Sequence, residues 1–437
     1  MHHLLFILLI LIPSFATGNN IIKDSEIEEA INLVVRPIIK ATNLQKLEIH
    51  IVNDGSLNAF TIGNNEIYIN SGLINQFQNM DIIRGVIAHE IGHILGKHII
   101  RQSENIDNSN KFLFSSIAIG LAGALVSGNV AVINPAIFGG IHVAERSILS
   151  HSRTFESSAD QTSLRLLEQS GYTCKGMIEF FEYMNRYHSN SFVNKYDQTH
   201  PLSQERLTSI RNFYNKSKFQ HKRNEPELEY KWDRAIAKLK AFTIEPQKIL
   251  SLITKSSSNE ITHYIKAINY FRNSDINNSI KYVDKLISLK PQDPFYHELK
   301  GQILFEFGKK EALDSYRTAT KFRPDDLLIR LSQVIVGISI YADDIEKMQE
   351  FYKDLKFISN KEPDNITALY YLSVFYEKTG HKSESLLASA IIAYKTGNFD
   401  RAKSYAKEAI KGLIIKSPDW HKANDIILLL EKFSKKS

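Results

Sequence analysis

Cysteine is almost absent from this chain: its 437 residues include one, Cys174. A single cysteine excludes an intrachain disulfide framework and a cysteine-based metal cluster. The chain also has no strong excess of charge of one sign. Its 54 basic residues are nearly balanced by 48 acidic ones, and the small excess is spread over both halves. A nucleic-acid-binding protein needs a concentrated basic field, so we expect no nucleic-acid partner.

The composition is that of a folded protein with two or three domains. Apolar residues make up 43% and charged residues 23% of the chain, which excludes a disordered or fibrous protein. Apolar spacing predicts a helix over 24–43, kinked at Pro37, and strands over 47–52 and 66–69. Beyond Asp81 the periodicity is almost entirely helical.

Charged residues are missing from residues 1–18. An apolar run over 4–12 ends at Pro13, and small residues at 16 and 18 suit cleavage before Asn19. This layout predicts a cleaved secretory signal peptide, although histidines stand where Lys or Arg is usual. The alternative is an uncleaved anchor, but the apolar run is too short to span a bilayer.

Proline and glycine residues recur at regular intervals in the C-terminal part of the chain. Pro291 and Pro324 lie 33 residues apart, and Gly380 and Gly397 lie 17 apart, about half of the 34-residue period of a tetratricopeptide repeat. Small residues over 402–409 have the spacing of the second helix of such a repeat. We therefore predict a helical repeat solenoid, with an unrelated helical bundle as the alternative.

Residues 86–95 contain a His-Glu-x-x-His motif. Residues four apart lie about 40° apart around a helix, so His89 and His93 project from one face and can take two corners of a tetrahedral zinc site. Glu90 can then serve as general base toward a water on the metal. The alternative, two core histidines, would leave Glu90 buried and unpaired, which is costly.

A third metal ligand is required, and His98 is a poor candidate. It follows His93 by five residues, about 140° around a helix, so we expect a structural or surface role. Glu156 and Asp160 share one face of a downstream helix. One of them can ligate zinc while the other orients a ligand imidazole; the alternative is a solvated acidic face.

Four segments together resemble peptidase family M48, in particular its periplasmic branch with tetratricopeptide repeats, the beta-barrel assembly-enhancing proteases. The segments are residues 58–69, 89–93, 152–160 and 199–206. The resemblance implies that His89, His93 and Glu156 bind one zinc ion. It also implies that Glu90 is the base and that Asp160 is an orienting or proton-donating acid.

The resemblance also has implications for how the substrate binds and for how the enzyme is restrained. It implies that the strand with Asn58, Ala59 and Phe60 offers an edge to which an extended substrate adds itself. It also implies that His200 lies on a loop that can occupy the fourth zinc position; the residues alone leave a transition-state donor or a capping residue equally open. Arg206 is a candidate helper in stabilising the oxyanion.

Residues 112–144 carry no formal charge, which raises the question of membrane insertion. One crossing would separate His93 from Glu156, and two crossings need about 40 residues. We expect a short helical hairpin that packs on the protease domain or makes peripheral contact with a membrane surface.

The sequence therefore predicts an α+β zincin-type metalloprotease domain, mostly helical with a small sheet, followed by an α-helical tetratricopeptide-repeat solenoid. The segments are a signal peptide (1–18), the zinc metalloprotease domain (19–215), a helical connector (216–258) and the repeat domain with a C-terminal capping helix (259–437). By resemblance, the enzyme is periplasmic, degrades misfolded or stalled outer-membrane β-barrel clients, and contacts the outer-membrane assembly machinery through its repeats. The alternative is a chaperone or assembly scaffold with a latent zinc site.

Overall fold

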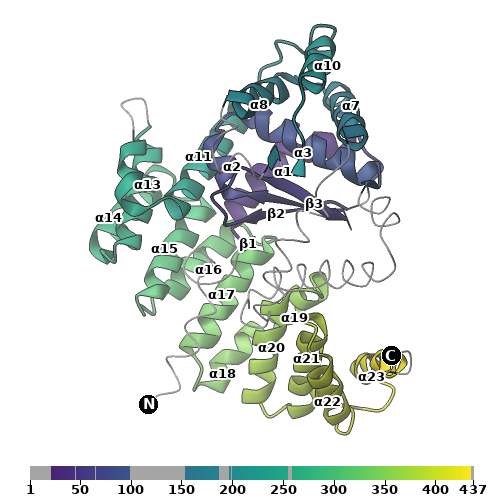
Figure 1. The fold of residues 1–437 in the computed structure, drawn as a ribbon. Coiled ribbons are helices and arrows are strands. Elements are labelled where there is room, and N and C mark those ends of the chain that lie inside the picture. Colours follow the sequence, from purple (N-terminus) through teal and green to yellow (C-terminus); the bar gives the residue numbers. More distant parts are fainter. Residues whose placement is uncertain are drawn as a thin grey trace. The chain divides into compact units, whose positions relative to one another are not determined.

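The structure is a computed structural model that describes residues 21–44, 46–63, 65–98, 153–186, 196–197, 199–253 and 258–434. The predicted signal peptide (1–18) and the charge-free segment (112–144) lie outside these residues. The described chain divides after Ser274 into two compact units (Figure 1), the N-terminal unit (21–274) and the helical unit (275–434). Among the described residues, no helix is both long enough and apolar enough to cross a membrane.

A four-stranded sheet lies in the N-terminal unit, in the order β1-β2-β4-β3. Strand β2 (Glu48–Val52) pairs antiparallel with β1 (Ile21–Ile22) and parallel with β4 (Glu66–Asn70), and β4 pairs antiparallel with β3 (Ala59–Gly63). The strands predicted over 47–52 and 66–69 are confirmed as β2 and β4. Strand β3 is an edge of the described sheet, as an added substrate strand requires.

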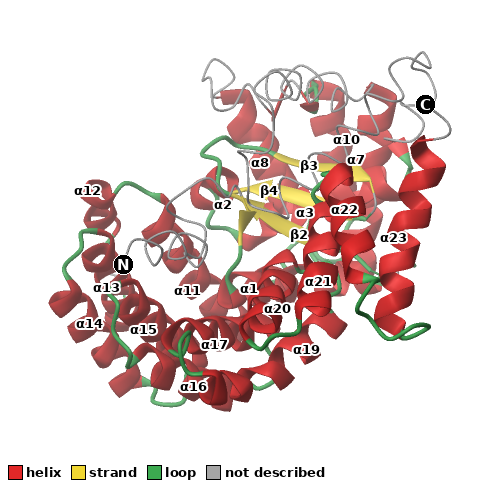
Figure 2. Cartoon of the chain, turned by 90° about the horizontal axis from the view of Figure 1, so that it is seen from below, coloured by secondary structure: helices red, strands yellow, loops and turns green. Residues whose placement is uncertain are grey.

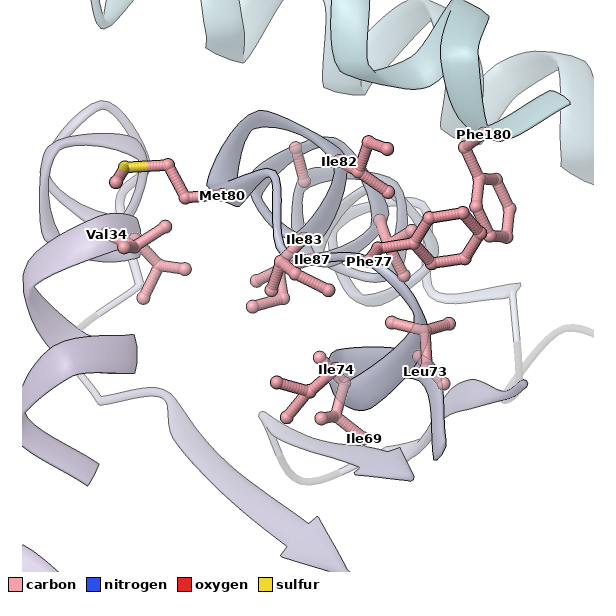
Figure 3. Packing of buried hydrophobic residues seen from close by; sticks show 14 of the residues in the cluster. Val34, Ile69, Leu73, Ile74, Phe77, Met80, Ile82, Ile83, Ile87 and Phe180 are labelled. Atoms are coloured by element: carbon pink, nitrogen blue, oxygen red, sulfur yellow. The ribbon is translucent and has the colours of Figure 1, made fainter. Parts of the chain in front are cut away.

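Most of the described N-terminal unit is helical. Its helices are α1 (Ser25–Lys40), α2 (Ser71–Gln76), α3 (Met80–Leu95), α7 (Arg153–Gln169), α8 (Lys175–Arg186), α10 (Gln204–Tyr214), α11 (Pro226–Thr243), α12 (Pro246–Ile249) and α13 (Asn259–Arg272). Helix α3 is central, because it packs on α1, α7, α8, β3 and β4. Apolar residues of β4, α2 and α3 meet in the core (Figure 3), where Phe77 packs edge-on against Phe180 of α8 at 5.4 Å between ring centroids.

Helix α1 illustrates how the sequence sets an element's limits. Its first turn is capped by Asp24, whose side chain accepts a hydrogen bond from the backbone N–H of Ile27. Its buried stripe runs from Ile27 to Ile38, at the spacing of an amphipathic helix. Pro37 lies in the last turn, and the helix ends at Lys40.

Helix α13 belongs to the N-terminal unit, although the repeat domain was predicted to begin at 259. A buried polar network holds it there: Glu26 of α1 contacts both Arg234 of α11 and Tyr264 of α13. Lys238 of α11 lies 2.7 Å from Asp24 and 3.4 Å from Glu26. Hydrophobic spacing alone does not distinguish this helix from those that follow it.

The helical unit consists of consecutive helices, each packed against its neighbours in the sequence (Figure 2). They are α14 (Ile276–Leu289), α15 (Pro294–Glu306), α16 (Ala312–Phe322), α17 (Leu327–Ile340), α18 (Ile345–Met348), a 3-10 turn (Gln349–Phe351), α19 (Tyr352–Lys361), α20 (Ile366–Lys378), α21 (Lys382–Lys395), α22 (Phe399–Ala409) and α23 (Pro418–Ser434). The predicted class, a mostly helical α+β domain followed by a helical region, is confirmed.

Small residues let helices of this unit approach one another closely. Ala402, Ala406 and Ala409 of α22 are fully buried, at the positions where the sequence predicted a tight helix contact. Gly397 precedes α22 with a φ of +75°, a conformation that glycine adopts without strain. These features agree with the predicted repeats, whose assignment as tetratricopeptide repeats stays a prediction.

Candidate metal centre

Helix α3 brings His89 and His93 together as their spacing predicted. The helix starts at Met80, where the Asn79 side chain accepts a hydrogen bond from the N–H of Asp81. One turn apart, the two imidazoles face each other with 3.0 Å between their Nε2 atoms. Both histidines and Glu90 between them are buried.

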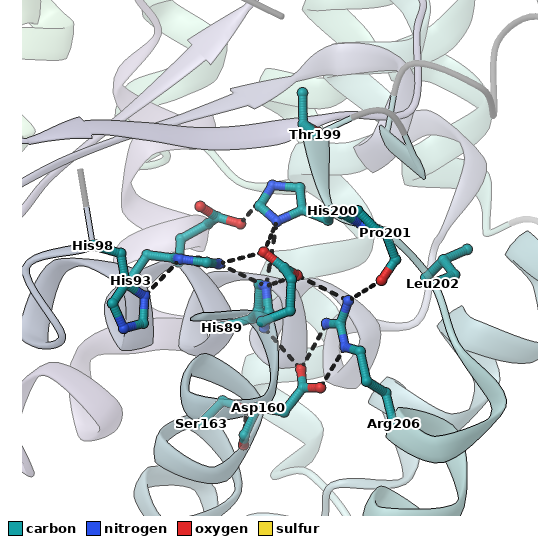
Figure 4. A network of polar contacts seen from close by, with 12 residues as sticks. His89, His93, His98, Asp160, Ser163, Thr199, His200, Pro201, Leu202 and Arg206 are labelled. Atoms are coloured by element: carbon teal, nitrogen blue, oxygen red, sulfur yellow. Dashed lines mark hydrogen bonds and ion pairs between the residues drawn. The ribbon is translucent and has the colours of Figure 1, made fainter. Parts of the chain in front are cut away.

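A close contact between α3 and α7 places two carboxylates beside these histidines. A Cβ atom on Gly92 would lie 2.6 Å from the carbonyl oxygen of Ala159, so glycine at 92 is what lets the α7 backbone come so near. Glu156 and Asp160 flank Ala159 on the same helix and are buried against α3. The predicted shared face of these two acids is therefore turned toward the histidines, and Figure 4 shows Asp160 beside His89.

Glu156 lies between the histidines. Its Oε2 is 3.3 Å from His89 Nε2 and its Oε1 is 3.2 Å from His93 Nε2. His200 completes the group, with Nδ1 3.3 Å from Glu156 Oε1 and 3.4 Å from His89 Nε2. These four buried residues offer one donor atom each, all within 4.8 Å of one another.

The spacing of these donors suits one tetrahedral metal ion. Ligand bonds of about 2.0–2.1 Å put the corners of a zinc tetrahedron about 3.3–3.4 Å apart. The separations from His89 Nε2 to Glu156 and His200 are 3.3 and 3.4 Å. Three imidazole nitrogens and one carboxylate also match the ligand types of zinc, so the residues present fit this ion.

Strong local charge accompanies this geometry. Burial lowers the pKa of His89, but its contacts with Asp160 and Glu156 outweigh burial and raise the pKa to about 10. Burial raises the pKa of Glu156, yet His200 and His89 hold it well below its ordinary value. The group therefore attracts positive charge to the point where the four donors meet.

Glu90 has a different environment from Glu156. Burial raises its pKa, with His200 and His89 opposing the rise. Neither carboxylate oxygen has a hydrogen-bond partner among the described residues, and a charged neighbour of Glu90 there is His200, whose Nε2 lies 3.5 Å from Oε1. A buried carboxylate without donors is costly to keep, which points to a chemical role for this side chain.

Asp160 and Arg206 support the donors instead of joining them. Asp160 Oδ1 lies 2.9 Å from His89 Nδ1, on the side of the ring away from the other donors. Arg206 donates hydrogen bonds from Nε and Nη2 to Asp160 at 2.6 and 2.9 Å, and its Nη1 lies 2.8 Å from Glu156 Oε2. The sequence analysis offered Arg206 as an oxyanion helper, but all three of its nitrogens contact carboxylates here.

His98 has a structural role, one of the two roles that the sequence predicted for it. It is buried, and its Nδ1 lies 3.0 Å from Nδ1 of His93 in a hydrogen bond. The helix ends at Leu95, and Lys97 adopts a left-handed φ of +51°, which turns the chain back over α3. The 140° offset of an unbroken helix therefore does not apply, and the two ligand histidines are oriented by different partners, Asp160 and His98.

The segment before α10 places His200 against strand β3. His200 Nε2 lies 3.3 Å from the carbonyl oxygen of Ala59, and the Thr199 hydroxyl donates to Asn58 Oδ1 at 3.4 Å. The imidazole stacks on Tyr196, a residue the sequence analysis missed, with 4.7 Å between ring centroids. Of the predicted substrate residues, Phe60 stacks on Tyr68 and does not join these contacts.

Comparison with known proteins agrees with this geometry. Residues 23–213 match the model of peptidase family M48. The chain is 22% identical over 403 residues to the putative beta-barrel assembly-enhancing protease of Vibrio cholerae, covering 89% of this chain and 81% of that protein.

Two further relatives match over shorter stretches. The beta-barrel assembly-enhancing protease of Escherichia coli is 26% identical over 200 residues, covering 44% of this chain and 40% of that protein. The mitochondrial metalloendopeptidase OMA1 of Saccharomyces cerevisiae is 29% identical over 172 residues, covering 38% and 46%. These two matches therefore span less than half of each relative, and the predicted resemblance is confirmed for the peptidase domain.

Proposed function

Since residues 23–213 form a metallopeptidase domain of family M48, we propose that the chain is a zinc-dependent endopeptidase acting on unfolded or misassembled proteins of the periplasm. The observation that carries this proposal is the pairing of four convergent donors with a buried, unpartnered carboxylate one residue from the first of them. A structural zinc site needs four protein donors but not the unpartnered carboxylate beside them.

Each side chain of the centre has a distinct part in this proposal. His89, His93 and Glu156 would hold the ion. Zinc at such a site supplies Lewis acidity, which polarises a peptide carbonyl and lowers the pKa of a coordinated water towards 7. Glu90 takes a proton from the attacking water and passes it to the nitrogen of the leaving amine. Asp160 and His98 fix the ring orientations of the two histidines.

Substrate would bind along the edge strand β3. An extended peptide can add itself there through backbone hydrogen bonds, which accept many sequences. The contacts of Thr199 and His200 with Asn58 and Ala59 lie at the same strand. His200 is therefore proposed as a restraining group, because its loop must leave β3 and the metal donors before a substrate can reach both.

The identity of the clients is proposed from the relatives' names. A beta-barrel assembly-enhancing protease acts in an envelope, which agrees with the predicted signal peptide at 1–18 and with cleavage before Asn19. We propose outer-membrane β-barrel proteins as clients and their assembly machinery as the partner of the helical unit, which would act as a tetratricopeptide-repeat surface. Membrane contact through 112–144 stays a prediction.

One observation favours a second function: His200 lies among the metal donors. With that loop in place the zinc site would be latent, and the protein would act as a chaperone or assembly scaffold through its helical unit. Loss of the biological effect on deletion of the helical unit (275–434), but not in Glu90→Gln, would support this function.

A cleavage assay distinguishes the two. The chain from Asn19 is incubated with an unfolded β-barrel protein, beside Glu90→Gln, His200→Ala and the exposed control Glu205→Gln. We expect Glu90→Gln to lose at least about 100-fold in rate, His200→Ala to cleave faster than wild type, and Glu205→Gln to match wild type.

Zinc content is measured on every variant, so that loss of the base is distinguished from loss of the ion. If Glu90→Gln cleaves as fast as wild type, the peptidase mechanism is wrong. If zinc is bound and neither wild type nor His200→Ala cleaves, the scaffold function replaces it.

A further inference from the structure

A second group of His and Glu side chains lies on the face of the sheet that is turned away from the apolar core. Glu48 and His50 are two residues apart on β2, so both point to the same face. The parallel register pairs Glu48 with Glu66 and His50 with Tyr68, which puts Glu66 on that face as well. The residues between them, Ile49 and Ile67, are paired on the opposite face, where Ile67 is part of the apolar core.

The three side chains converge. Glu48, His50 and Glu66 each offer one donor atom, and these atoms all lie within 4.8 Å of one another. His50 Nε2 is 3.7 Å from Glu48 Oε2. The corners of a zinc tetrahedron are about 3.3–3.4 Å apart, so closure by at most about 1.5 Å would bring all three into contact with one ion.

His50 is the independent sign that a ligand belongs here. It is 8% exposed, and its Nδ1 is a buried atom with no hydrogen-bond partner in the described structure. Its Nε2 has only the 3.7 Å contact with Glu48, too long for a hydrogen bond. Buried polar groups are nearly always satisfied, because an unmet one has lost the hydrogen bonds that it makes to water in the unfolded chain.

One carboxylate of the group is already oriented. The Tyr68 hydroxyl donates a hydrogen bond of 2.7 Å to Glu66 Oε2. Tyr68 is itself buried, and its ring packs against His50 with 4.9 Å between centroids. Such partners of a ligand usually fix its position for metal binding.

The local charge is balanced by a residue that can move away. Lys46 forms an ion pair with Glu48, and its side chain is 78% exposed. An exposed ion pair contributes little to stability, so a divalent cation can displace this ammonium group at small cost.

We propose that Glu48, His50 and Glu66 bind a divalent transition-metal ion of the Zn²⁺ type, at a site separate from the candidate catalytic centre. The imidazole selects against Mg²⁺ and Ca²⁺, which prefer all-oxygen ligands. The ion would link β2 to β4 at the face opposite the α3 histidines. This inference is independent of the proposed peptidase activity.

Equilibrium dialysis against buffered Zn²⁺, with metal counted by mass spectrometry, tests the site on the untagged chain from Asn19. We expect two ions per wild-type chain, and at least tenfold weaker binding of the second in His50→Gln and Glu66→Gln. Lys46→Ala should bind the second ion more tightly, because the competing cation is gone. The exposed control Glu227→Gln should match wild type, and excess Mg²⁺ should not displace the ion.

Two readouts keep the site apart from the catalytic centre and from damage to the fold. His50→Gln should retain the first ion, the circular dichroism spectrum and wild-type cleavage, since it touches none of the α3 donors. If the number and the affinity of the ions bound by the wild-type chain are unchanged in His50→Gln and Glu66→Gln, the proposal is overturned.

Discussion

The two units of the chain differ in whether their charged side chains are buried or exposed. The N-terminal unit buries charged groups in quantity, both at the candidate metal centre and in the network of Glu26, Arg234 and Lys238. The helical unit keeps its described ion pairs nearer to solvent: Lys300 and Asp284 are 29% and 50% exposed. Its core is instead apolar, with buried alanines and aromatic rings.

This difference shows where the chain has a constraint besides stability. A buried ion pair rarely stabilises a fold more than apolar residues of the same size would. The helical unit has an apolar core, which is the less costly arrangement. The N-terminal unit instead buries charged groups that packing does not require. At the metal centre those groups have a chemical use; in the Glu26 network they attach α13 to α1 and α11.

The largest expected difference between the units comes from removing one lysine from each. Lys238→Met removes the ammonium group from Asp24 and Glu26, of which Glu26 keeps its contact with Arg234, and should destabilise the N-terminal unit by about 3–5 kcal/mol. Lys300→Met in the helical unit should cost at most about 1 kcal/mol. The free energy of unfolding is measured in urea.

Each unit supplies its own probe for that measurement. Trp232 and Cys174 are buried in the N-terminal unit, and Trp420 lies in the helical unit. Tryptophan fluorescence in a Trp420→Phe background and thiol labelling of Cys174 therefore follow the first unit alone. Equal effects of the two lysine variants would contradict the comparison.

Two glycine substitutions test backbone contact against side-chain contact. Gly92→Ala places Cβ 2.6 Å from a backbone oxygen of Ala159, which cannot move without shifting α7, so we expect a loss of about 3 kcal/mol. Gly301→Ala meets the Tyr316 ring at 2.7 Å, and a ring can rotate.

Both glycine changes gain about 1 kcal/mol of helix propensity, so Gly301→Ala should be nearly neutral and the difference isolates the α3–α7 contact. Gly92→Ala should also lower zinc affinity, because α7 carries Glu156. An affinity and stability equal to wild type would show that α7 is not held by this contact.

A smaller effect is expected from the partner of His93. His98→Phe keeps a ring over Phe155, on which His98 stacks at 4.6 Å, but removes the acceptor for the Nδ1–H of His93. We expect zinc affinity to fall about 10–100-fold, measured by competition with a chromophoric chelator. His98→Asn, whose Oδ1 can replace Nδ1, should restore most of the affinity; equal loss in both variants would indicate a packing role only.

The smallest expected effect is a pH dependence confined to the helical unit. Burial raises the pKa of Glu306 to about 7, against a weaker opposing hydrogen bond from Gln302. The folded state thus binds this proton more tightly than the unfolded state, so its contribution to stability is complete below about pH 4.5 and is lost as pH rises through 7.

Between pH 5 and 8 we expect wild type to lose about 1–2 kcal/mol more stability in the helical unit than Glu306→Gln does, after allowance for partial exposure. Trp420 fluorescence in a Trp232→Phe background measures it. Parallel pH profiles of the two chains would exclude Glu306 as the source.

Residue spacing predicted a feature correctly wherever that feature lay within one helix or one strand. It placed β2, β4 and the facing histidines of α3, and it put Glu156 and Asp160 on one face of α7. It predicted a structural or surface role for His98 but not its contact with His93, because the end of α3 and the left-handed Lys97 lie outside helical geometry. It placed the start of the repeat domain at 259, whereas a buried network between distant segments links α13 to α1 and α11.

By itself the sequence determined the elements and the type of chemistry, because periodicity and ligand spacing act over a few residues within one helix or strand. Only the tertiary structure decided which groups meet. It set Arg206 against carboxylates, His200 against β3, and His50 beside Glu66. Such contacts depend on how closely α3, α7 and the sheet approach one another, and that distance is fixed by packing at positions such as Gly92.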